Sequence, residues 1–248
     1  MKLKLWRKIY NKAAKKVLCS NLIRHKEPSL IYSPDGTLPN KFLIDLTLRA
    51  VEKAWNEPII VADQLLNDSV FLNEFPGEHY RILKAITSII SPSVVLEIGT
   101  YTGMGSLAIM QGQSNGCLYT FDICPWNSFS THLLQKDFDQ ARIVQITADL
   151  SESEVFKKYL TLLNEANIIF VDAPKDGIFE YKFLDLIKIL DPKKNKLLIL
   201  DDIRFINMID LWINIESPKI DITSFGHWSG TGLVDISNGL KLKKDFLG

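Results

Sequence analysis

The stretch Val94-Val95-Leu96-Glu97-Ile98-Gly99-Thr100-Tyr101-Thr102-Gly103 joins an apolar, strand-like run to a turn that contains two glycines. Glycine tolerates a positive φ angle and lets the backbone approach a ligand closely. The spacing Gly99-x-x-x-Gly103-x-Gly105 differs from the G-x-G-x-x-G turn that seats a pyrophosphate on a helix N-terminus. Glu97 just before this turn suits a ligand with an ammonium group better than one with a pyrophosphate. The stretch therefore predicts the opening of a nucleotide-like cofactor site.

Strand-like and helical patterns alternate from residue 93 onward. The strand-like runs are Val94–Ile98, Leu118–Asp122, Arg142–Thr147, Ile168–Asp172 and Leu197–Asp201, and the helical patterns lie at about 104–111, 128–138, 152–164, 177–190 and 204–214. This alternation predicts right-handed βαβ units and a parallel sheet with both faces covered. The last two runs, Ile220–Phe225 and Gly232–Ile236, are too close for a parallel crossover and predict an antiparallel hairpin.

The predicted fold class is therefore α/β. We expect a Rossmann-like, doubly wound, mostly parallel seven-stranded sheet that ends in an antiparallel β-hairpin, with an N-terminal helical extension. Residues 1–70 are expected to form basic amphipathic and accessory helices, with helical patterns at 40–56 and 58–67, and residues 71–248 the α/β domain. Glu78–Ile90 predicts a helix that leads into the first strand after the break at Pro76-Gly77.

Charge is distributed unevenly along the chain. Residues 1–26 hold nine Lys/Arg and no Asp/Glu, while the rest holds 20 basic against 29 acidic residues. Residues 3–18 predict an amphipathic helix whose apolar stripe is Leu3, Trp6, Ile9, Tyr10, Ala13 and Val17. Such a helix packs on the body of the protein or on a second subunit of a homodimer, or makes peripheral contact with an anionic membrane surface. The acidic body and the lack of a binding motif argue against nucleic acid.

The remaining composition is that of an ordinary soluble globular protein. Cys19, Cys117 and Cys124 are too few and too scattered for a disulfide framework, and none lies in a C-x-x-C pair. No apolar run approaches the roughly 20 residues needed to span a bilayer, and the N-terminus lacks the apolar region of a signal peptide. A reducing, cytoplasmic setting is expected.

Acidic side chains stand at or beside the ends of four of the five parallel strands. Ligands of doubly wound sheets bind at the carboxyl ends of the strands, near the switch in strand order. The polar set expected at this edge is Glu97, Gly99, Asp122, Asp149, Asp172, Lys175, Asp201 and Asp202. Asp122 is placed to accept hydrogen bonds from ribose hydroxyls. Asp149 is placed to meet the amine of adenine, or to cap the following helix.

Four motifs, in order along the chain, resemble the O-methyltransferase families, which include the catechol and caffeoyl-coenzyme A enzymes and bacterial small-molecule relatives. The motifs are Glu97–Gly103, Phe121-Asp122-Ile123, Phe170-Val-Asp172-Ala-Pro-Lys175-Asp176 and Leu200-Asp201-Asp202, and the likeness covers about residues 75–237. It implies a class I S-adenosylmethionine-dependent methyltransferase, a fold in which five α/β units end in a β-hairpin. The implied cofactor-binding residues are Glu97, Gly99, Thr100, Tyr101, Gly103, Asp122, Ile123, Asp149, Leu150 and Asp172.

The same resemblance implies a metal site and a base. In the metal-dependent members, positions that match Asp172, Asp201 and Asp202 bind a divalent cation, usually Mg²⁺, but this chain has Asp202 where asparagine is usual. Three carboxylates still suit a hard cation; the alternative is a substrate-binding Asp201 beside a helix-capping Asp202. A lysine three residues after the strand-four aspartate removes the hydroxyl proton in the catechol enzymes, and Lys175 matches it.

A lysine titrates near 10.4, so Lys175 must be desolvated or placed near a cation to act as a base at neutral pH. The alternative is a surface lysine at a helix start. His227, in the turn of the expected hairpin, and His79 are the other candidate bases. The expected catalytic set is Lys175, Asp172 and His227.

The expected function is S-adenosylmethionine-dependent methylation of a hydroxyl on a small molecule or on a glycan- or lipid-linked acceptor. Two alternatives stay open. One is an NAD-dependent Rossmann oxidoreductase, against which the glycine spacing and the closing hairpin argue. The other is a non-catalytic cofactor-binding scaffold recruited to membranes by residues 1–26. The acceptor pocket is expected between residues 20–80 and 225–231, where the resemblance is thinnest.

Overall fold

The computed structural model describes residues 37–61, 67–75, 77–139 and 142–243. The expected basic helix at residues 3–18 lies outside this part of the chain. No helix in the described ranges is long and apolar enough to cross a membrane.

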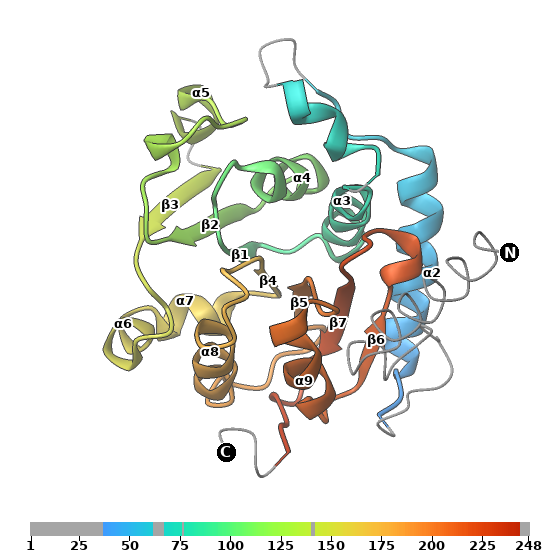
Figure 1. Ribbon diagram of the computed structural model, residues 1–248, viewed down its shortest axis with the longest axis vertical. Coiled ribbons are helices and arrows are strands. Elements are labelled where there is room, and N and C mark those ends of the chain that lie inside the picture. The colour runs from blue at the N-terminus through green and yellow to red at the C-terminus, as the bar shows by residue number, and fades with distance from the viewer. Residues whose placement is uncertain (1–36, 62–66, 76, 140–141, 244–248) are drawn as a thin grey trace, which may run out of the picture.

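Seven strands form one sheet in the order β3-β2-β1-β4-β5-β7-β6 (Figure 1). Their bounds are β1 Val94–Ile98, β2 Cys117–Asp122, β3 Ile143–Thr147, β4 Ile168–Val171, β5 Leu197–Asp201, β6 Lys219–Asp221 and β7 Thr231–Asp235. Strands β1 to β5 pair in parallel, whereas β7 pairs antiparallel with both β5 and β6. The expected doubly wound sheet with a closing antiparallel hairpin is confirmed.

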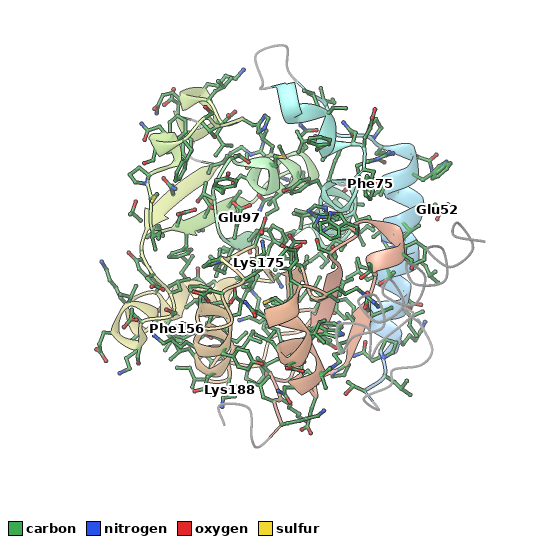
Figure 2. All side chains as sticks on the ribbon, viewed as in Figure 1. Glu52, Phe75, Glu97, Phe156, Lys175 and Lys188 are labelled. Carbon is green, nitrogen blue, oxygen red and sulfur yellow. The ribbon has the colours of Figure 1, made fainter. Side chains whose placement is uncertain are left out.

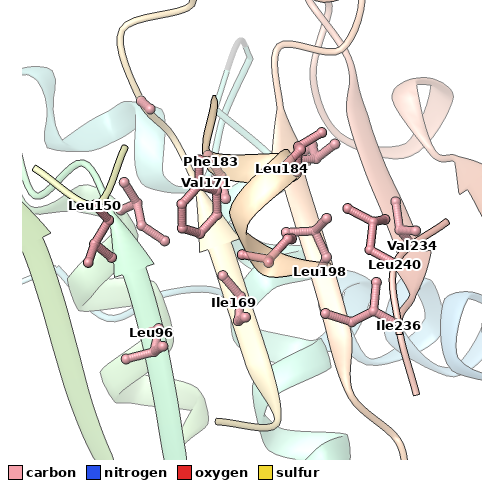
Figure 3. Close-up of a cluster of buried hydrophobic side chains, with 14 of the residues drawn as sticks. Leu96, Leu150, Ile169, Val171, Phe183, Leu184, Leu198, Val234, Ile236 and Leu240 are labelled. Atoms are coloured by element: carbon pink, nitrogen blue, oxygen red, sulfur yellow. The ribbon is translucent and has the colours of Figure 1, made fainter. Parts of the chain in front are cut away.

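Helices cover both faces of the sheet (Figure 1). Those of one face are α2 Lys41–Asn56, α3 His79–Ile90 and α4 Met104–Gly112; those of the other are α6 Ser153–Lys158, α7 Leu160–Glu165, α8 Phe179–Ile187 and α9 Ile206–Asn214. Side chains of a strand alternate between faces, so Val95 joins the core under α2 to α4, while Leu96 joins the core under α6 to α9. Figure 3 shows the second core, with Phe183 and Leu184 over Ile169 and Leu198.

Helix α2 is the described helix of the expected N-terminal extension, and it packs against α3 beside the hairpin. The Asn40 side chain caps it by accepting a hydrogen bond from the amide of Leu43, 3.0 Å away. Its buried residues include Leu46 and Ala50, which belong to the same core as α3 and the sheet. The extension therefore contributes directly to one covered face of the α/β domain.

Two expected helices are wrong, because side chains hold the backbone in other conformations. At 58–67, residues 58–61 are not helical, and the short 3₁₀ segment η2 spans Asn67–Leu72. Asn73 binds both the amide and the carbonyl of Ile59, at 2.7 and 2.9 Å. At 128–138, only the short helix α5, Gln135–Asp139, and part of the 3₁₀ segment η3, Trp126–Ser128, form.

The second of these segments has a packing role at the glycine turn. The Thr131 hydroxyl and the His132 amide both donate to the carbonyl of Thr102, at 3.1 and 2.9 Å. Leu133 fills the space beside Gly103, where a Cβ added to Gly103 would lie 2.4 Å from the Leu133 Cγ.

The strand expected at Ile220–Phe225 is shorter in the structure, because β6 ends at Asp221. The Asp221 carboxylate accepts from the amide and hydroxyl of Thr223, which begins the 3₁₀ segment η4, Thr223–Phe225.

Candidate active site

A pocket of about 600 Å³ opens at the carboxyl ends of β1 to β4. Its wall includes Ile98, Gly99, Tyr101, Phe121, Asp122, Ile123, Ala148, Asp149, Ser151, Glu152, Asp172, Ala173, Pro174, Lys175, Asp176, Ile178, Phe179 and Lys182. The strand order reverses between β1 and β4, which is where doubly wound sheets bind ligands. We name this the cofactor pocket.

Gly99 permits the close meeting of β1 and β4 at the base of the cofactor pocket. Its φ angle is +98°, and an added Cβ would lie 2.1 Å from the carbonyl oxygen of Asp172. A side chain there would therefore be strained and would also collide with backbone.

Asp122 ends β2 and lines the same pocket. One carboxylate oxygen accepts from the amide of Tyr101 and the other from the amide of Cys124, both at 3.0 Å. A carboxylate has about four lone-pair sites, so each oxygen keeps capacity for a ligand hydroxyl. The two amides fix the carboxylate in place before any ligand arrives.

Six of the ten expected cofactor-binding residues line the cofactor pocket: Gly99, Tyr101, Asp122, Ile123, Asp149 and Asp172. Asp149 forms a turn through its carboxylate, which accepts from the amide of Ser151 at 2.8 Å. In the described part of the chain, the other four expected residues do not line this pocket: Glu97, Thr100, Gly103 and Leu150. Thr100 is buried and pairs with the hydroxyl of Thr120 at 2.7 Å, and Leu150 is buried in the core under α6 to α9.

Glu97 lies beneath the turn and is 1% exposed. The Ser106 hydroxyl of α4 donates to one of the Glu97 oxygens. The other oxygen, Oε1, would lie only 2.3 Å from a Cβ added to Gly105. Burial raises the pKa of Glu97 to about 8. The carboxyl is therefore largely neutral at pH 7 in these surroundings.

A cluster of one cation, Lys175, and three carboxylates lies beside the cofactor pocket. Figure 2 labels Lys175 in the middle of the molecule. The Lys175 ammonium contacts Asp172, lies 3.0 Å from Asp202 Oδ2 and lies 3.8 Å from Asp201 Oδ2. Asp172 and Lys175 follow β4, and Asp201 and Asp202 stand at the end of β5, so two neighbouring strand ends bring these groups together. We name them the Lys175 cluster.

The surroundings of Lys175 are the opposite of those that a lysine base needs. Burial alone would lower its pKa, but the three carboxylates raise the pKa of Lys175 above its usual value. The side chain therefore carries its proton at neutral pH. Burial, and then the charge of Asp201, raise the pKa of Asp172 to about 6.

Three of the five described non-glycine residues with positive φ lie at this site: Tyr101 at 39°, Lys175 at 57° and Asp202 at 57°. Such backbone costs on the order of 1–3 kcal/mol per residue and gathers at functional sites. The sequence carries no signal for this strain, because the residue types are unremarkable there.

The three carboxylates also test the expected metal site. One oxygen from each of Asp172, Asp201 and Asp202 lies within 4.8 Å of the others, which suits a hard cation by donor type. The Lys175 ammonium, however, contacts two of the three and offsets one of their negative charges. The cluster as folded does not fit Mg²⁺, because the ion would have to displace this ammonium.

His79 and His227 stack on the far side of Asp201, with ring centroids 4.1 Å apart. The Nδ1 atom of His227 lies 3.3 Å from Asp201 Oδ1 and 2.9 Å from the Ser229 hydroxyl. Burial lowers the pKa of His227, but the Asp201 carboxylate 3.3 Å away outweighs it and raises the pKa above its usual value. Burial and His227 lower the pKa of His79 to about 3, so His79 is neutral.

A second pocket, of about 450 Å³, opens next to His227 between α2, α3 and the β6–β7 connection. Its walls are rich in aromatic residues: Trp55, Phe75, Phe225 and Trp228. Trp55 is 84% exposed and Phe75 66% exposed. The pocket lies within the two segments expected to shape an acceptor site, but pattern reasoning did not find Trp55, whose helix position looks like any other exposed residue.

No protein-family model matches the chain, and no curated protein matches it. Among solved structures, it is similar to the SAH-bound methyltransferase PaMTH1 of Podospora anserina, with 16% identity over 81% of this chain and 88% of the other, at a TM-score of 0.45. It is also similar to an O-methyltransferase of Bacillus cereus in complex with SAH, with 14% identity over 81% and 94% of the chains, at a TM-score of 0.41. Likeness of this degree carries no weight for activity, which has to be argued from the pockets themselves.

Proposed function

We propose that this protein transfers a methyl group from S-adenosylmethionine to a hydroxyl of a small molecule. The observation that carries the proposal is the position of Asp122, a preorganised carboxylate at the wall of a pocket that opens where the strand order reverses. The motif resemblance supports the choice of cofactor. The closing antiparallel hairpin supports it over a dinucleotide, whose fold continues in parallel to a sixth strand.

In this proposal the ribose of the cofactor binds to Asp122, and the adenine lies near Ile123 and Asp149. The methionine end then points along Gly99 toward Asp172, both of which line the pocket. The sulfonium carries a positive charge, and an opposite charge nearby favours the ionised form of a carboxyl such as that of Asp172. This orientation places the methyl group beside the Lys175 cluster.

The acceptor oxygen attacks the methyl carbon as the carbon–sulfur bond breaks, which leaves S-adenosylhomocysteine (SAH). Most of the rate then comes from holding oxygen, carbon and sulfur in line. The protonated Lys175 orients the acceptor oxygen and stabilises negative charge on it. Asp172 takes the hydroxyl proton, because its pKa of about 6 is nearer to neutrality than that of Lys175.

The acceptor occupies the second pocket, which reaches the cluster through His227. Its aromatic walls favour a flat or apolar acceptor over a bare sugar. Catechol and simple phenols are therefore the first acceptors to test.

The proposal is tested by calorimetric titration with S-adenosylmethionine, SAH and NADH. We expect the first two to bind and NADH to give no heat. Asp122→Ala removes a charged acceptor, so it should weaken binding of both adenosyl ligands at least tenfold, which corresponds to about 1.4 kcal/mol. The matched control is Glu154→Gln on α6, whose side chain is 87% exposed and which should bind as the wild type does.

Two results would overturn the proposal: binding of NADH without S-adenosylmethionine, or equal affinity in the wild type and Asp122→Ala. A protein that binds the cofactor but releases no SAH with any catechol or phenol would match the scaffold alternative instead.

We also propose two contacts for residues 1–26, on the basis of their positive charge and of the apolar stripe predicted within residues 3–18. One is peripheral binding to an anionic membrane, and the other is packing in a homodimer. Co-sedimentation with vesicles that contain phosphatidylserine should fall when residues 1–26 are deleted or when salt is raised. If vesicle binding survives the deletion, the membrane contact lies elsewhere; a change in mass by light scattering would indicate the dimer.

A further inference from the structure

The two oxygens of Asp201 face different partners. Oδ2 faces the Lys175 ammonium at 3.8 Å, on the side of the cofactor pocket. Oδ1 faces the histidines: His227 Nδ1 lies 3.3 Å away and His79 Nε2 lies 4.0 Å away. Asp201 is only 4% exposed, and in the described part of the chain its Oδ1 has no hydrogen-bond partner. A buried carboxylate oxygen without a hydrogen bond is costly.

His79, which faces this oxygen of Asp201, is also buried without side-chain hydrogen bonds among the described residues. It is 4% exposed, and neither of its ring nitrogens has a hydrogen-bond partner among the described residues. The backbone fixes its position at the start of α3, where its amide donates to the carbonyl of Gly226 at 2.9 Å. The ring stacks between Tyr80 and His227, with centroids 4.0 and 4.1 Å away. Two buried polar groups therefore face each other at 4.0 Å, too far apart for a hydrogen bond.

We propose that His79, Asp201 and His227 bind a divalent transition-metal ion, of the class of Zn²⁺, Fe²⁺ or Co²⁺. One nitrogen of each histidine and one oxygen of Asp201 lie within 4.8 Å of one another. Bonds of about 2.0–2.2 Å at tetrahedral angles place ligand atoms roughly 3.4 Å apart. The 3.3 and 4.0 Å separations therefore need only small side-chain movements. We name these three residues the His–Asp–His site.

The donor set decides the class of metal. Two imidazoles and one carboxylate suit zinc, iron, cobalt or nickel, whereas magnesium and calcium prefer oxygen alone. Both ring nitrogens of His79 are buried and lack a hydrogen-bond partner among the described residues, so one of them is available to a metal. The three carboxylates of the Lys175 cluster would instead favour magnesium or calcium. The Lys175 ammonium, however, contacts these carboxylates and would have to be displaced by the ion. The His–Asp–His site also borders the second pocket through His227, so a bound ion could meet an acceptor oxygen there.

The test is a titration of the full, tag-free chain with Co²⁺, whose visible absorption reports nitrogen and oxygen ligands directly. We expect one ion per chain, unchanged by a large excess of Mg²⁺ and displaced by Zn²⁺. His79→Leu and His227→Ala should each weaken Co²⁺ binding at least 100-fold, since each removes a ligand. The variant His25→Ala, in the basic N-terminal segment, is the matched control for non-specific histidine binding.

Asp172→Asn separates the two candidate metal sites, because Asp172 belongs only to the Lys175 cluster. Binding of Co²⁺ within threefold of the wild type in Asp172→Asn is expected. If Asp172→Asn abolishes binding while His79→Leu and His227→Ala retain it, or if the wild type binds no Co²⁺, the His–Asp–His site is wrong. His227 lies in the β6–β7 connection and its side chain is less buried than that of His79, at 12% against 4% exposed, so its variant tests the proposal even if His79→Leu does not fold. None of these readouts requires methyl transfer, so the outcome is independent of the proposed function.

Discussion

At the scale of single residues, burial decides what the titratable groups can do. Glu97 is buried under the glycine turn with one hydrogen bond, and its pKa is raised to about 8. Asp122 stands at the pocket wall with both oxygens held by amides. The first acts as a neutral packing group and the second as a charged acceptor, although both are acids at the ends of neighbouring strands.

Glu97→Gln should remove part of the pH dependence of stability. Below the unfolded-state pKa of about 4.5, Glu97 is protonated in both states. As pH rises toward 8, the unfolded chain releases this proton and the folded protein keeps it, so wild-type stability falls by up to about 1.4 kcal/mol per pH unit. Glutamine does not titrate. Urea unfolding at pH 5, 6.5 and 8 measures the free energy of unfolding of both proteins. The value for Glu97→Gln minus the value for the wild type should increase with pH. A difference that stays constant with pH would contradict the conclusion that burial raises the pKa of Glu97.

Asp172→Asn should reduce turnover and leave the cofactor bound. The amide cannot take the hydroxyl proton, and loss of a general base typically costs about 10²- to 10⁴-fold in rate. The Kd for S-adenosylmethionine should change less than tenfold, because Asp122 is intact. SAH release with the best phenol or catechol acceptor measures the rate, and Asp185→Asn on α8 is the control. Equal turnover in Asp172→Asn and the wild type would remove Asp172 from the chemistry.

At the scale of elements, a buried lysine ties the last helix to the hairpin. Lys219 begins β6, is 2% exposed and donates to the carbonyls of Trp212 and Ile215, at 2.6 and 2.7 Å, where α9 ends. Its charge also complements the negative end of the helix dipole. This contact ties the carboxyl end of α9 to the first residue of β6.

Lys219→Met should therefore lower the free energy of unfolding by about 2–4 kcal/mol, because two carbonyls at the end of α9 each lose a hydrogen bond from a buried ammonium. Affinity for SAH should stay within a few-fold of that of the wild type. Urea unfolding measures the first quantity and calorimetry the second. The exposed Lys194→Met, as control, should change stability by less than about 0.5 kcal/mol. Equal losses in the two variants would mean that the buried contact adds nothing.

The elements that the sequence predicts well are those whose signal is local. Strands β1 and β5 have the expected bounds because each is a mainly apolar run with a local end: β1 stops before Gly99, and β5 ends at Asp201. Residues 128–134 could not be assigned in this way, because their conformation depends on the carbonyl of Thr102, which lies far away in sequence. The same holds for the bonds between Asn73 and Ile59.

At the scale of the whole molecule, two pockets lie on either side of one charged layer. The cofactor pocket borders Lys175 and Asp172, and the second pocket borders His227. The grouping of the acids at the strand ends could be predicted, because the carboxyl ends of parallel strands share one edge of the sheet. The ion pairs between these acids and Lys175 could not be predicted, since they depend on positive φ angles at Lys175 and Asp202. The aromatic second pocket arises where α2 meets the hairpin, a packing that no local pattern encodes.

The central claim is that the adenosyl cofactor binds in the pocket between β1 and β4, and a crystal structure of the protein with SAH tests it most directly. The account predicts a ribose hydroxyl within about 3.2 Å of an Asp122 carboxylate oxygen, and a sulfur atom that faces Asp172 and Lys175. SAH bound in the second pocket, or in the cofactor pocket without contact to Asp122, would contradict it.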